Sequence, residues 1–192
     1  MIPAPLLVLI GPAATGKSTV GALVADLLGV PFVDVDAVAD AAYAEVGWSV
    51  DRLVDRIAAV GRYAAEVEWE PARAHAVVRV LADHPASVVA LGAGHTSYTR
   101  AELAGAVRSV LGEVPVVVLL LPAATPGDAL VVLRARSLAT KGTDWVRDGH
   151  DFLAGWLADP EVRSLATHVV VTGDEPPGLT AERVARLVRP AG

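Results

Sequence analysis

The hydrophobic pattern divides the chain into short apolar runs separated by longer amphipathic stretches. The runs are rich in Val, Leu and Ile with few polar interruptions, a pattern typical of strands buried on both faces of a parallel sheet. We predict strands at Leu6–Ile10, Pro31–Asp36, Ser87–Leu91, Val114–Leu121 and His168–Thr172. We predict helices at Lys17–Leu28, Ala37–Glu45, Val50–Val60, within Tyr63–Ala82, and at Thr99–Leu111, Gly127–Leu138, Trp145–Leu157 and Thr180–Val188.

This alternation of strands and helices predicts the fold class. It implies βαβ crossovers and therefore an α/β three-layer sandwich around a five-stranded parallel sheet. Residues 37–86 are too long for one crossover and hold two or three predicted helices, so we expect a helical flap over the site. Residues 134–150 are polar and contain glycine, which is typical of a mobile lid. We predict a single domain over residues 1–192.

The composition narrows the functional classes. A net charge of −6 argues against a nucleic-acid partner, and the absence of cysteine excludes disulfides and thiolate chemistry. The apolar runs are too short to span a bilayer, and the first of them is expected to be a strand rather than a signal peptide. We therefore expect a soluble, cytoplasmic protein without a membrane partner. The oligomeric state is left open.

The sequence GPAATGKS follows the first predicted strand and fits the phosphate-loop pattern G-x-x-x-x-G-K-[ST]. Glycines let the backbone N–H groups turn inward, and the helix that follows adds its positive dipole end. Lys17 is expected to pair with the β- and γ-phosphates of ATP, and Ser18 to bind Mg²⁺. A plain glycine turn is the alternative, but the flanking strand and helix favour the phosphate loop. The predicted nucleotide-binding residues are Gly11, Ala14, Thr15, Gly16, Lys17, Ser18 and Thr19.

The second predicted strand ends in FVDVD, which places two carboxylates, Asp34 and Asp36, on the same face at its carboxyl end. One could hold Mg²⁺ and the other could accept a proton from an attacking hydroxyl. The alternative is structural, with Asp36 capping the next helix and Asp34 a polar residue at the strand end.

The third predicted strand ends in LGAGHTS. Gly92 and Gly94 permit a ligand to approach the backbone closely. His95 is a candidate for substrate contact or proton handling, with a loop histidine of no chemical role as the alternative.

Taken together, the order of these motifs resembles the shikimate kinase family and its gluconate kinase neighbours. These are small P-loop kinases of the nucleoside and shikimate kinase-like group. The resemblance implies that Asp36 binds the acceptor and acts as the base, that Asp34 lies near Mg²⁺, and that Gly92 and Gly94 match the first and third glycines of the family's G-G-G. It also implies phosphate-reaching arginines near the lid, for which Arg134 and Arg136 are the candidates. The final segment resembles the family's adenine-side loop, where Pro176 would contact the nucleotide.

The flap departs from the family pattern. Shikimate kinases hold a substrate carboxylate with arginines, but Arg62, Arg73 and Arg163 do not align with those positions, so an acceptor other than shikimate is expected. Glu66 and Glu70 lie in this region, on one helical stripe with Arg73, where Glu70 and Arg73 could pair. They are candidates to hold a polyhydroxyl or amine-bearing acceptor, and a solvated helix face is the alternative. The tryptophans of the flap and lid are expected in the core, with stacking on a ligand ring as the alternative.

These features favour an ATP- and Mg²⁺-dependent kinase that transfers the γ-phosphate to a hydroxyl of a small metabolite such as a sugar, cyclitol or nucleoside. A nucleotide-binding sensor or accessory protein without kinase activity is the main alternative, suggested by the missing arginines. Simple NTP hydrolysis is a weaker one, because no water-orienting Gln or Glu is evident.

Overall fold

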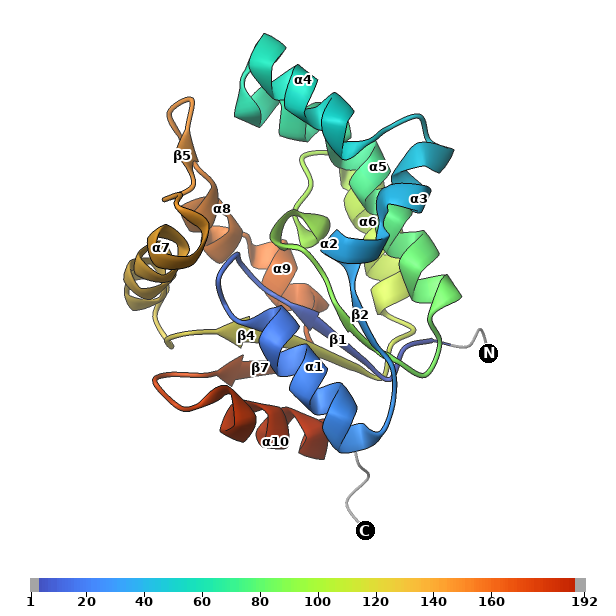
Figure 1. Cartoon of the computed structure of the whole chain (residues 1–192), viewed down its shortest axis with the longest axis vertical. Coiled ribbons are helices and arrows are strands. Elements are labelled where there is room, and N and C mark those ends of the chain that lie inside the picture. Colours follow the sequence, from blue (N-terminus) through green and yellow to red (C-terminus); the bar gives the residue numbers. More distant parts are fainter. Residues whose placement is uncertain (1–3, 189–192) are drawn as a thin grey trace.

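The computed structural model describes residues 4–188, and its central feature is one parallel sheet (Figure 1). The sheet order is β2-β3-β1-β4-β7, and every neighbouring pair is parallel. This confirms the predicted fold class and all five strands, each of which is one to three residues shorter than the predicted run. The strands are β1 (Leu7–Ile10), β2 (Phe32–Asp34), β3 (Val88–Ala90), β4 (Val116–Leu121) and β7 (His168–Val171).

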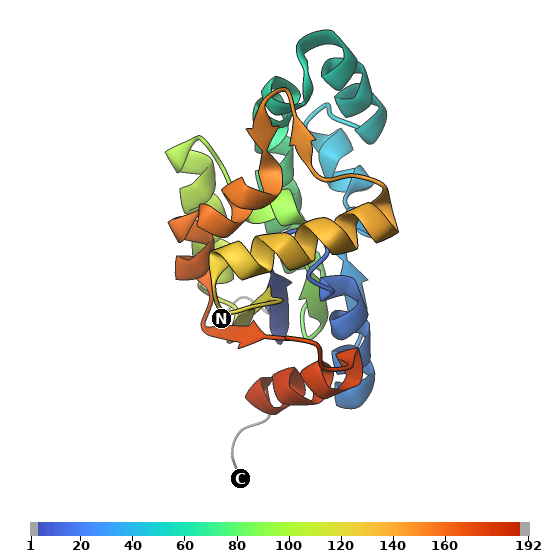
Figure 2. The ribbon, with the colours of Figure 1, turned by 90° about the vertical axis from the view of Figure 1, so that its left-hand side faces the viewer.

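Helices cover both faces of the sheet and complete the three layers (Figures 1 and 2). On one face, α1 (Lys17–Leu28) packs against α10 (Pro177–Val188), and their apolar side chains form a core with β1, β4 and β7. On the other face, α5 (Arg62–Asp83) packs against α6 (Ala101–Leu111), with α9 (Pro160–Leu165) beside β4. The strands read as continuous apolar runs because both of their faces are buried in this way.

The segment predicted as a flap holds four helices between β2 and β3. They are α2 (Val35–Val38), α3 (Asp40–Glu45), α4 (Val50–Val60) and α5. The predicted helix Ala37–Glu45 is split between α2 and α3. Ser49 caps α4 by accepting a hydrogen bond from the Arg52 N–H (3.1 Å), and Gly61, at φ 84°, separates α4 from α5. The α4–α5 hairpin thus projects away from the sheet, at the top of Figure 1.

The region around the predicted lid differs from its prediction. We expected one helix over Trp145–Leu157, but the first part is a two-stranded hairpin, β5 (Val146–Arg147) and β6 (His150–Asp151), followed by α8 (Phe152–Ala158). The turn residues Asp148 and Gly149 both have positive φ, at 53° and 74°, which is the geometry that Asp-Gly favours in tight hairpins. This turn signal overrides the helical spacing of the apolar residues. The preceding helix, α7 (Pro126–Lys141), extends past the predicted end, and the short 3₁₀ turn η1 (Ala93–Thr96) follows β3.

None of the helices described between residues 4 and 188 is long and apolar enough to cross a membrane. The connections after β1, β2 and β3 all lie at the carboxyl edge of the sheet. From β1 the chain continues to β2 and β3 on one side of β1, and then crosses to β4 on the other side of β1. In open α/β sheets, ligands bind at the carboxyl edge where the strand order changes direction in this way.

Candidate active site

The phosphate loop joins β1 to α1 and has the backbone geometry of an anion cradle. Gly11, Ala14 and Gly16 all have positive φ, at 136°, 62° and 90°. A Cβ atom added to Gly11 would lie 2.6 Å from the Leu120 carbonyl oxygen, so the loop can follow this path against β4 only with glycine there. The loop leads into the N-terminus of α1, whose unpaired N–H groups and dipole favour a bound phosphate.

Lys17 is buried at the start of α1, and its side chain folds back over the loop. The Nζ atom donates to the main-chain oxygens of Gly11 and Pro12, each at 2.8 Å. Burial lowers the pKa of Lys17 to about 8, against the raising effect of the Asp36 carboxylate. A phosphate beside Nζ would raise this pKa again, because an anion favours the charged ammonium.

The two aspartates at the carboxyl end of β2, Asp34 and Asp36, have different local roles. Asp34 caps α2, since its Oδ1 accepts a hydrogen bond from the Asp36 N–H (3.1 Å), so Asp34 rather than Asp36 is the capping residue of the structural alternative. The Asp36 side chain is 65% exposed and free of this role. Although the side chain is exposed, partial desolvation by the surrounding cavity wall, and then the neighbouring Asp34 carboxylate, raise the pKa of Asp36 against the lowering effect of Lys17.

Ser18 and Asp34 are suitable ligands for Mg²⁺. A hydroxyl and one free carboxylate oxygen beside a phosphate cradle are the kind of oxygen donors that Mg²⁺ uses together with nucleotide phosphates and water. Within residues 4–188, no group of three or more His, Asp or Glu side chains is arranged to hold a metal by itself. The two protein oxygens would therefore share the ion with nucleotide phosphates and water.

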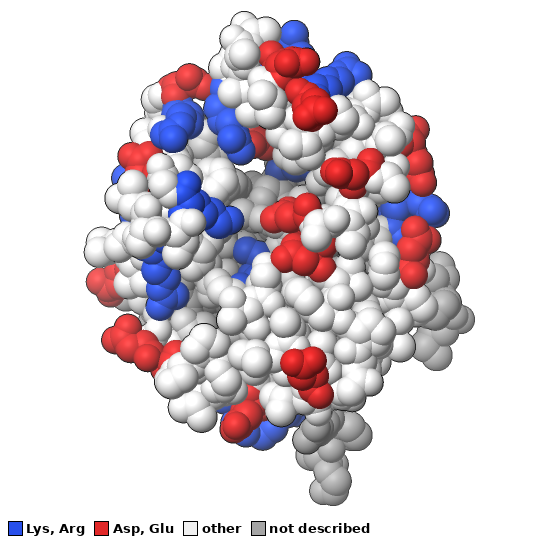
Figure 3. All heavy atoms as spheres, viewed as in Figure 1, with Lys and Arg blue, Asp and Glu red and all other residues white. Residues whose placement is uncertain are grey.

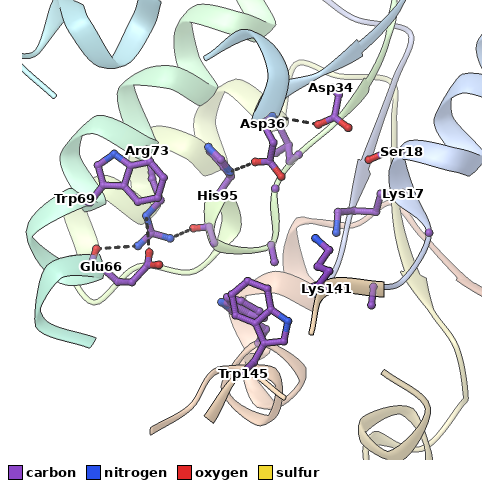
Figure 4. A pocket seen from close by; sticks show the side chains of 18 of the residues that line it. Lys17, Ser18, Asp34, Asp36, Glu66, Trp69, Arg73, His95, Lys141 and Trp145 are labelled. Atoms are coloured by element: carbon purple, nitrogen blue, oxygen red, sulfur yellow. Dashed lines mark hydrogen bonds and ion pairs between the residues drawn. The ribbon is translucent and has the colours of Figure 1, made fainter. Parts of the chain in front are cut away.

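A cavity of about 360 Å³ opens between the phosphate loop, the flap and the lid. Figure 3 shows a hollow at the centre of one face, with basic side chains on one side and acidic ones on the other. In Figure 4, Lys17 and Ser18 lie across this space from Arg73, Trp69 and Glu66, with Asp36 and His95 between them. The predicted site residues that line it are Ala14, Gly16, Lys17, Ser18, Thr19, Asp34, Asp36, Glu66, Gly92, Gly94 and His95.

Six of the predicted site residues do not line this cavity: Gly11, Thr15, Glu70, Arg134, Arg136 and Pro176. Gly11 and Thr15 belong to the inner side of the phosphate loop, where the Thr15 hydroxyl donates to the Pro12 oxygen (3.1 Å). Pro176 is exposed at the start of the C-terminal helix and stays a prediction for adenine contact.

Glu70 is held away from the cavity by a different partner. It is 2% exposed, and its carboxylate accepts hydrogen bonds from the Thr99 N–H (2.7 Å) and hydroxyl (3.1 Å). The pair with Arg73 that the sequence spacing allowed does not form, because the Arg73 guanidinium is turned toward Gly94 instead. In this structure Glu70 anchors the loop before α6.

The two lid arginines lie outside the cavity. Arg134 pairs with Asp151, the residue that caps α8, and Arg136 donates to the Gly173 oxygen (3.4 Å). The lid cation that does line the cavity is Lys141, at the last turn of α7. Lys141 was not among the predicted site residues, although Gly142 directly after it is a signal for the end of a helix inside the predicted lid.

The end of the cavity away from the phosphate loop holds a cluster of three charged residues: Arg62, Glu66 and Arg73. Arg62 Nε and Nη2 lie 2.8 and 2.7 Å from Glu66 Oε1, and Arg73 Nε lies 4.0 Å from Glu66 Oε2. Arg73 also donates to the Gly94 oxygen and, at 3.2 Å, to the Glu66 main-chain oxygen. Neither arginine aligns with the positions of the family's arginines, yet the fold brings both to the cavity wall.

Tryptophan side chains complete the wall. Trp69 lies beside Arg73, whose guanidinium carbon is 5.8 Å from its ring centre, and Trp145 lies edge-on to Trp156 at 5.3 Å. All three line the cavity and are packed against core residues, so their expected core packing is confirmed, and stacking on a ligand ring stays a prediction.

Comparisons with known sequences and structures identify relatives of this chain. The family model described as "Shikimate kinase" matches residues 13–125, more than half of the chain. A shikimate kinase of Streptomyces avermitilis is 41% identical over 103 residues, a match that covers 53% of this chain and 54% of that protein. The chain thus spans about half the length of the curated relatives it matches.

Solved structures extend the similarity to nearly the whole fold. A shikimate kinase from Acinetobacter baumannii in complex with shikimate has a TM-score of 0.67 at 21% identity, over 96% of this chain and 92% of that one. A shikimate kinase from Aquifex aeolicus has a TM-score of 0.59 at 20% identity, over 95% of each chain. At these identities the likeness shows the fold.

Proposed function

The chain belongs to the shikimate kinase family, and we propose that it is an ATP- and Mg²⁺-dependent kinase that phosphorylates a hydroxyl group of a small metabolite. The observation that carries this proposal is one cavity in which Lys17 and Ser18 face Asp36. A phosphate donor on the loop and an acceptor beside Asp36 would meet in that space.

The nucleotide end supplies positioning and positive charge. The loop N–H groups, the α1 dipole and Lys17 would hold the β- and γ-phosphates. Ser18 and Asp34 would hold Mg²⁺, which neutralises charge on the phosphates when bound. Lys141 is the lid residue best placed to approach the transferring phosphoryl group, because it lines the cavity whereas Arg134 and Arg136 do not.

The acceptor end supplies the base. Asp36 would take the proton from the acceptor hydroxyl while the hydroxyl oxygen forms a bond to the γ-phosphorus. The bond between the γ-phosphorus and the β–γ bridging oxygen would break in the same step, and ADP would leave. A carboxylate with a raised pKa is a stronger base than a free one, which suits this step. Gly92 and Gly94 leave room for the acceptor against the backbone.

The acceptor itself is proposed to be a small hydroxylated compound that meets the Arg62–Glu66–Arg73 cluster. Two arginines share one glutamate there, so the cluster retains positive charge and would attract an anionic group on the acceptor. Shikimate, which the Acinetobacter baumannii protein is in complex with, is therefore the first compound to test, next to sugar acids, neutral sugars, cyclitols and nucleosides.

The nucleotide-sensor alternative predicts the same ATP binding without product. The test is an ADP-release screen over these acceptors, with ATP binding measured in parallel by calorimetry. Acceptor-dependent ADP release with a phosphorylated product supports the kinase. Tight ATP binding with no release for any acceptor would sink the kinase proposal and leave the sensor.

Two variants tie the activity to the site. Lys17→Ala should abolish turnover, and Asp36→Asn should lower kcat by about 10²- to 10⁴-fold, the usual contribution of a positioned base. Asp40→Asn is the matched control, because Asp40 is an exposed carboxylate in the same flap that does not line the cavity. Equal losses in Asp36→Asn and Asp40→Asn would contradict the assignment of the base.

A further inference from the structure

His95 is a buried histidine beside the proposed base, and the steps described above make no use of it. Its side chain is 3% exposed, at the start of the loop after β3. The ring lies between two polar groups, one from α3 in the flap and one from α2 directly after β2. Nε2 is 2.9 Å from the Tyr43 hydroxyl oxygen, and Nδ1 is 3.9 Å from Asp36 Oδ1. Figure 4 shows the Nδ1 side of the ring directed at Asp36.

The Tyr43 hydroxyl decides which ring nitrogen carries the proton. Tyr43 is 3% exposed, and within residues 4–188 its hydroxyl has one hydrogen-bond partner, His95 Nε2. If Nε2 carried the proton, the phenolic hydrogen would be buried without an acceptor, which is costly. Tyr43 therefore donates to Nε2, and the ring proton sits on Nδ1. Burial raises the pKa of Tyr43, so the phenol keeps its proton.

The Nδ1–H group then faces Asp36, with the Gly92 main chain beside the ring, where its hydrogen-bonding effect raises the pKa of His95 against the larger effect of burial. Nδ1 is buried and has no hydrogen-bond partner among the described residues. The distance of 3.9 Å to Oδ1 exceeds a hydrogen bond, for which the usual range ends at about 3.2 Å. Asp36 is 65% exposed, so a rotation of its side chain can close this gap. A Cβ atom on Gly92 would lie 2.6 Å from Nδ1 and closer still to Asp36, so glycine keeps the space between the two side chains open.

The surroundings of His95 keep its ring neutral, so the contact with Asp36 is one between a neutral N–H group and a carboxylate. Burial and then the Arg73 guanidinium lower the pKa of His95 to about 3, so the ring is neutral under working conditions. A neutral N–H group can hold a carboxylate in place without taking its charge away. The charged groups that act on His95 or Asp36 are Lys17, Asp34, Arg73 and Lys141.

We propose that Tyr43 and His95 are positioning residues for Asp36, and that they form a fixed relay in which the Tyr43 hydroxyl donates to Nε2 and Nδ1–H donates to one Asp36 oxygen when the acceptor binds. The other oxygen then faces the acceptor hydroxyl. No proton moves along the relay, and the acceptor proton goes to Asp36 alone. The role of Asp36 as base rests on the proposed function, whereas the tautomer of His95 does not.

The first test needs no acceptor. Nitrogen NMR of protein labelled at histidine should show His95 with the proton on Nδ1 in the wild type. Tyr43→Phe should convert it to the Nε2–H form or to a mixture, because it removes the hydroxyl and keeps the ring that packs on Trp69 at 5.1 Å. Tyr98→Phe is the matched control, since the Tyr98 hydroxyl donates to the main-chain oxygen of His95 (3.0 Å) and not to its ring. An Nε2–H tautomer in the wild type, or no change in Tyr43→Phe, overturns the proposal.

The second test separates positioning from folding. Tyr43→Phe should lower kcat roughly 3- to 10-fold, the effect of one hydrogen bond, with the acceptor KM within about twofold. His95→Leu should lower kcat at least as much. His95→Asn should retain most of the wild-type kcat, because its side-chain amide can place an N–H group near the position that Nδ1 occupies in the wild type. A loss in which Asn is no better than Leu, with both folded by circular dichroism, contradicts the relay.

The two proposals can fail independently. If no acceptor is phosphorylated, the kinase proposal fails, and the NMR comparison of wild type, Tyr43→Phe and Tyr98→Phe still decides the relay. If phosphotransfer occurs and His95 is found as Nε2–H, the kinase stands and the relay is overturned.

Discussion

Gly92 offers the sharpest test of how the site is built, through the single substitution Gly92→Ala. Its φ of −62° is ordinary for any residue, so alanine brings no backbone strain. The added methyl carbon would, however, lie 2.6 Å from His95 Nδ1 and closer still to Asp36 Oδ1. Ordinary contact begins at 3.4 Å. His95 must therefore withdraw by about 0.8 Å, and Asp36 by more.

The two neighbours respond differently, and this sets the magnitudes. His95 is buried, so moving it resembles overpacking a core, at a cost of about 1–3 kcal/mol. For a chain of this size, that lowers Tm by roughly 2–4 °C per kcal/mol. Asp36 is exposed and swings aside freely, but a misplacement of about 1 Å in a reacting group costs on the order of 100-fold in rate, or about 2.7 kcal/mol. We expect a folded protein with a modestly lower Tm and kcat about 100-fold lower.

The assay is acceptor-dependent ADP release, with thermal unfolding followed on the same samples. Gly105→Ala is the matched control, because a Cβ atom there meets nothing within 4 Å and alanine favours the helix, so kcat should hold and Tm should not fall. A Gly92→Ala protein that keeps kcat within about threefold would refute this reasoning. So would a loss of activity explained entirely by unfolding.

Three further predictions concern other parts of the site. Glu66→Gln should lower the KM for anionic acceptors about tenfold with little effect on stability, because it frees two arginines. Glu70→Gln should instead cost about 1–3 kcal/mol of stability and leave the acceptor KM unchanged. Identical behaviour of the two variants in kinetics and chemical denaturation would contradict these separate roles. Lys141→Ala should lower kcat more than Arg136→Ala, measured at saturating ATP, and the reverse order would return the lid role to Arg136. The pKa of His95 is lowered to about 3 in the folded state, against about 6.5 in the unfolded chain, so the unfolded chain binds the proton first as pH drops and folding stability should fall from pH 6.5 toward 3. Denaturation measured across that range should show a smaller fall for His95→Asn than for the wild type. An equal fall in both proteins would contradict the lowered pKa.

The phosphate loop and the five strands could be predicted from the sequence because their signals are local. A glycine pattern between an apolar run and a helix has few other solutions, and a strand buried on both faces needs no knowledge of its partners. The cap of α8 is local in the same sense, because Asp151 accepts a hydrogen bond from the Ala154 N–H three residues on (3.1 Å).

The acceptor end of the cavity was predicted less well because its geometry depends on distant segments. Glu70 and Arg73 are three residues apart, and spacing alone suggested a pair. Their actual partners, Thr99 and Gly94, come from the loop after β3. Only the packing of α5 on that loop decides between the two arrangements. The hairpin at Asp148–Gly149 is a different case, since its turn signal was present in the sequence but lay within apolar spacing that also suited a helix.

The same hairpin ties together the two coverings of the cavity. The Asp148 carboxylate accepts a hydrogen bond from the main-chain N–H of Arg62, directly after Gly61 at the joint between α4 and α5. Because this hydrogen bond joins the two segments, a displacement of the joint should displace the hairpin, and a displacement of the hairpin should displace the joint. On the proposed function, we expect this hydrogen bond to couple closure over the acceptor to closure over the nucleotide, so that each ligand tightens the binding of the other to the same degree. Asp148→Ala would remove this hydrogen bond and should make the affinity for the acceptor independent of the nucleotide, and that for the nucleotide independent of the acceptor.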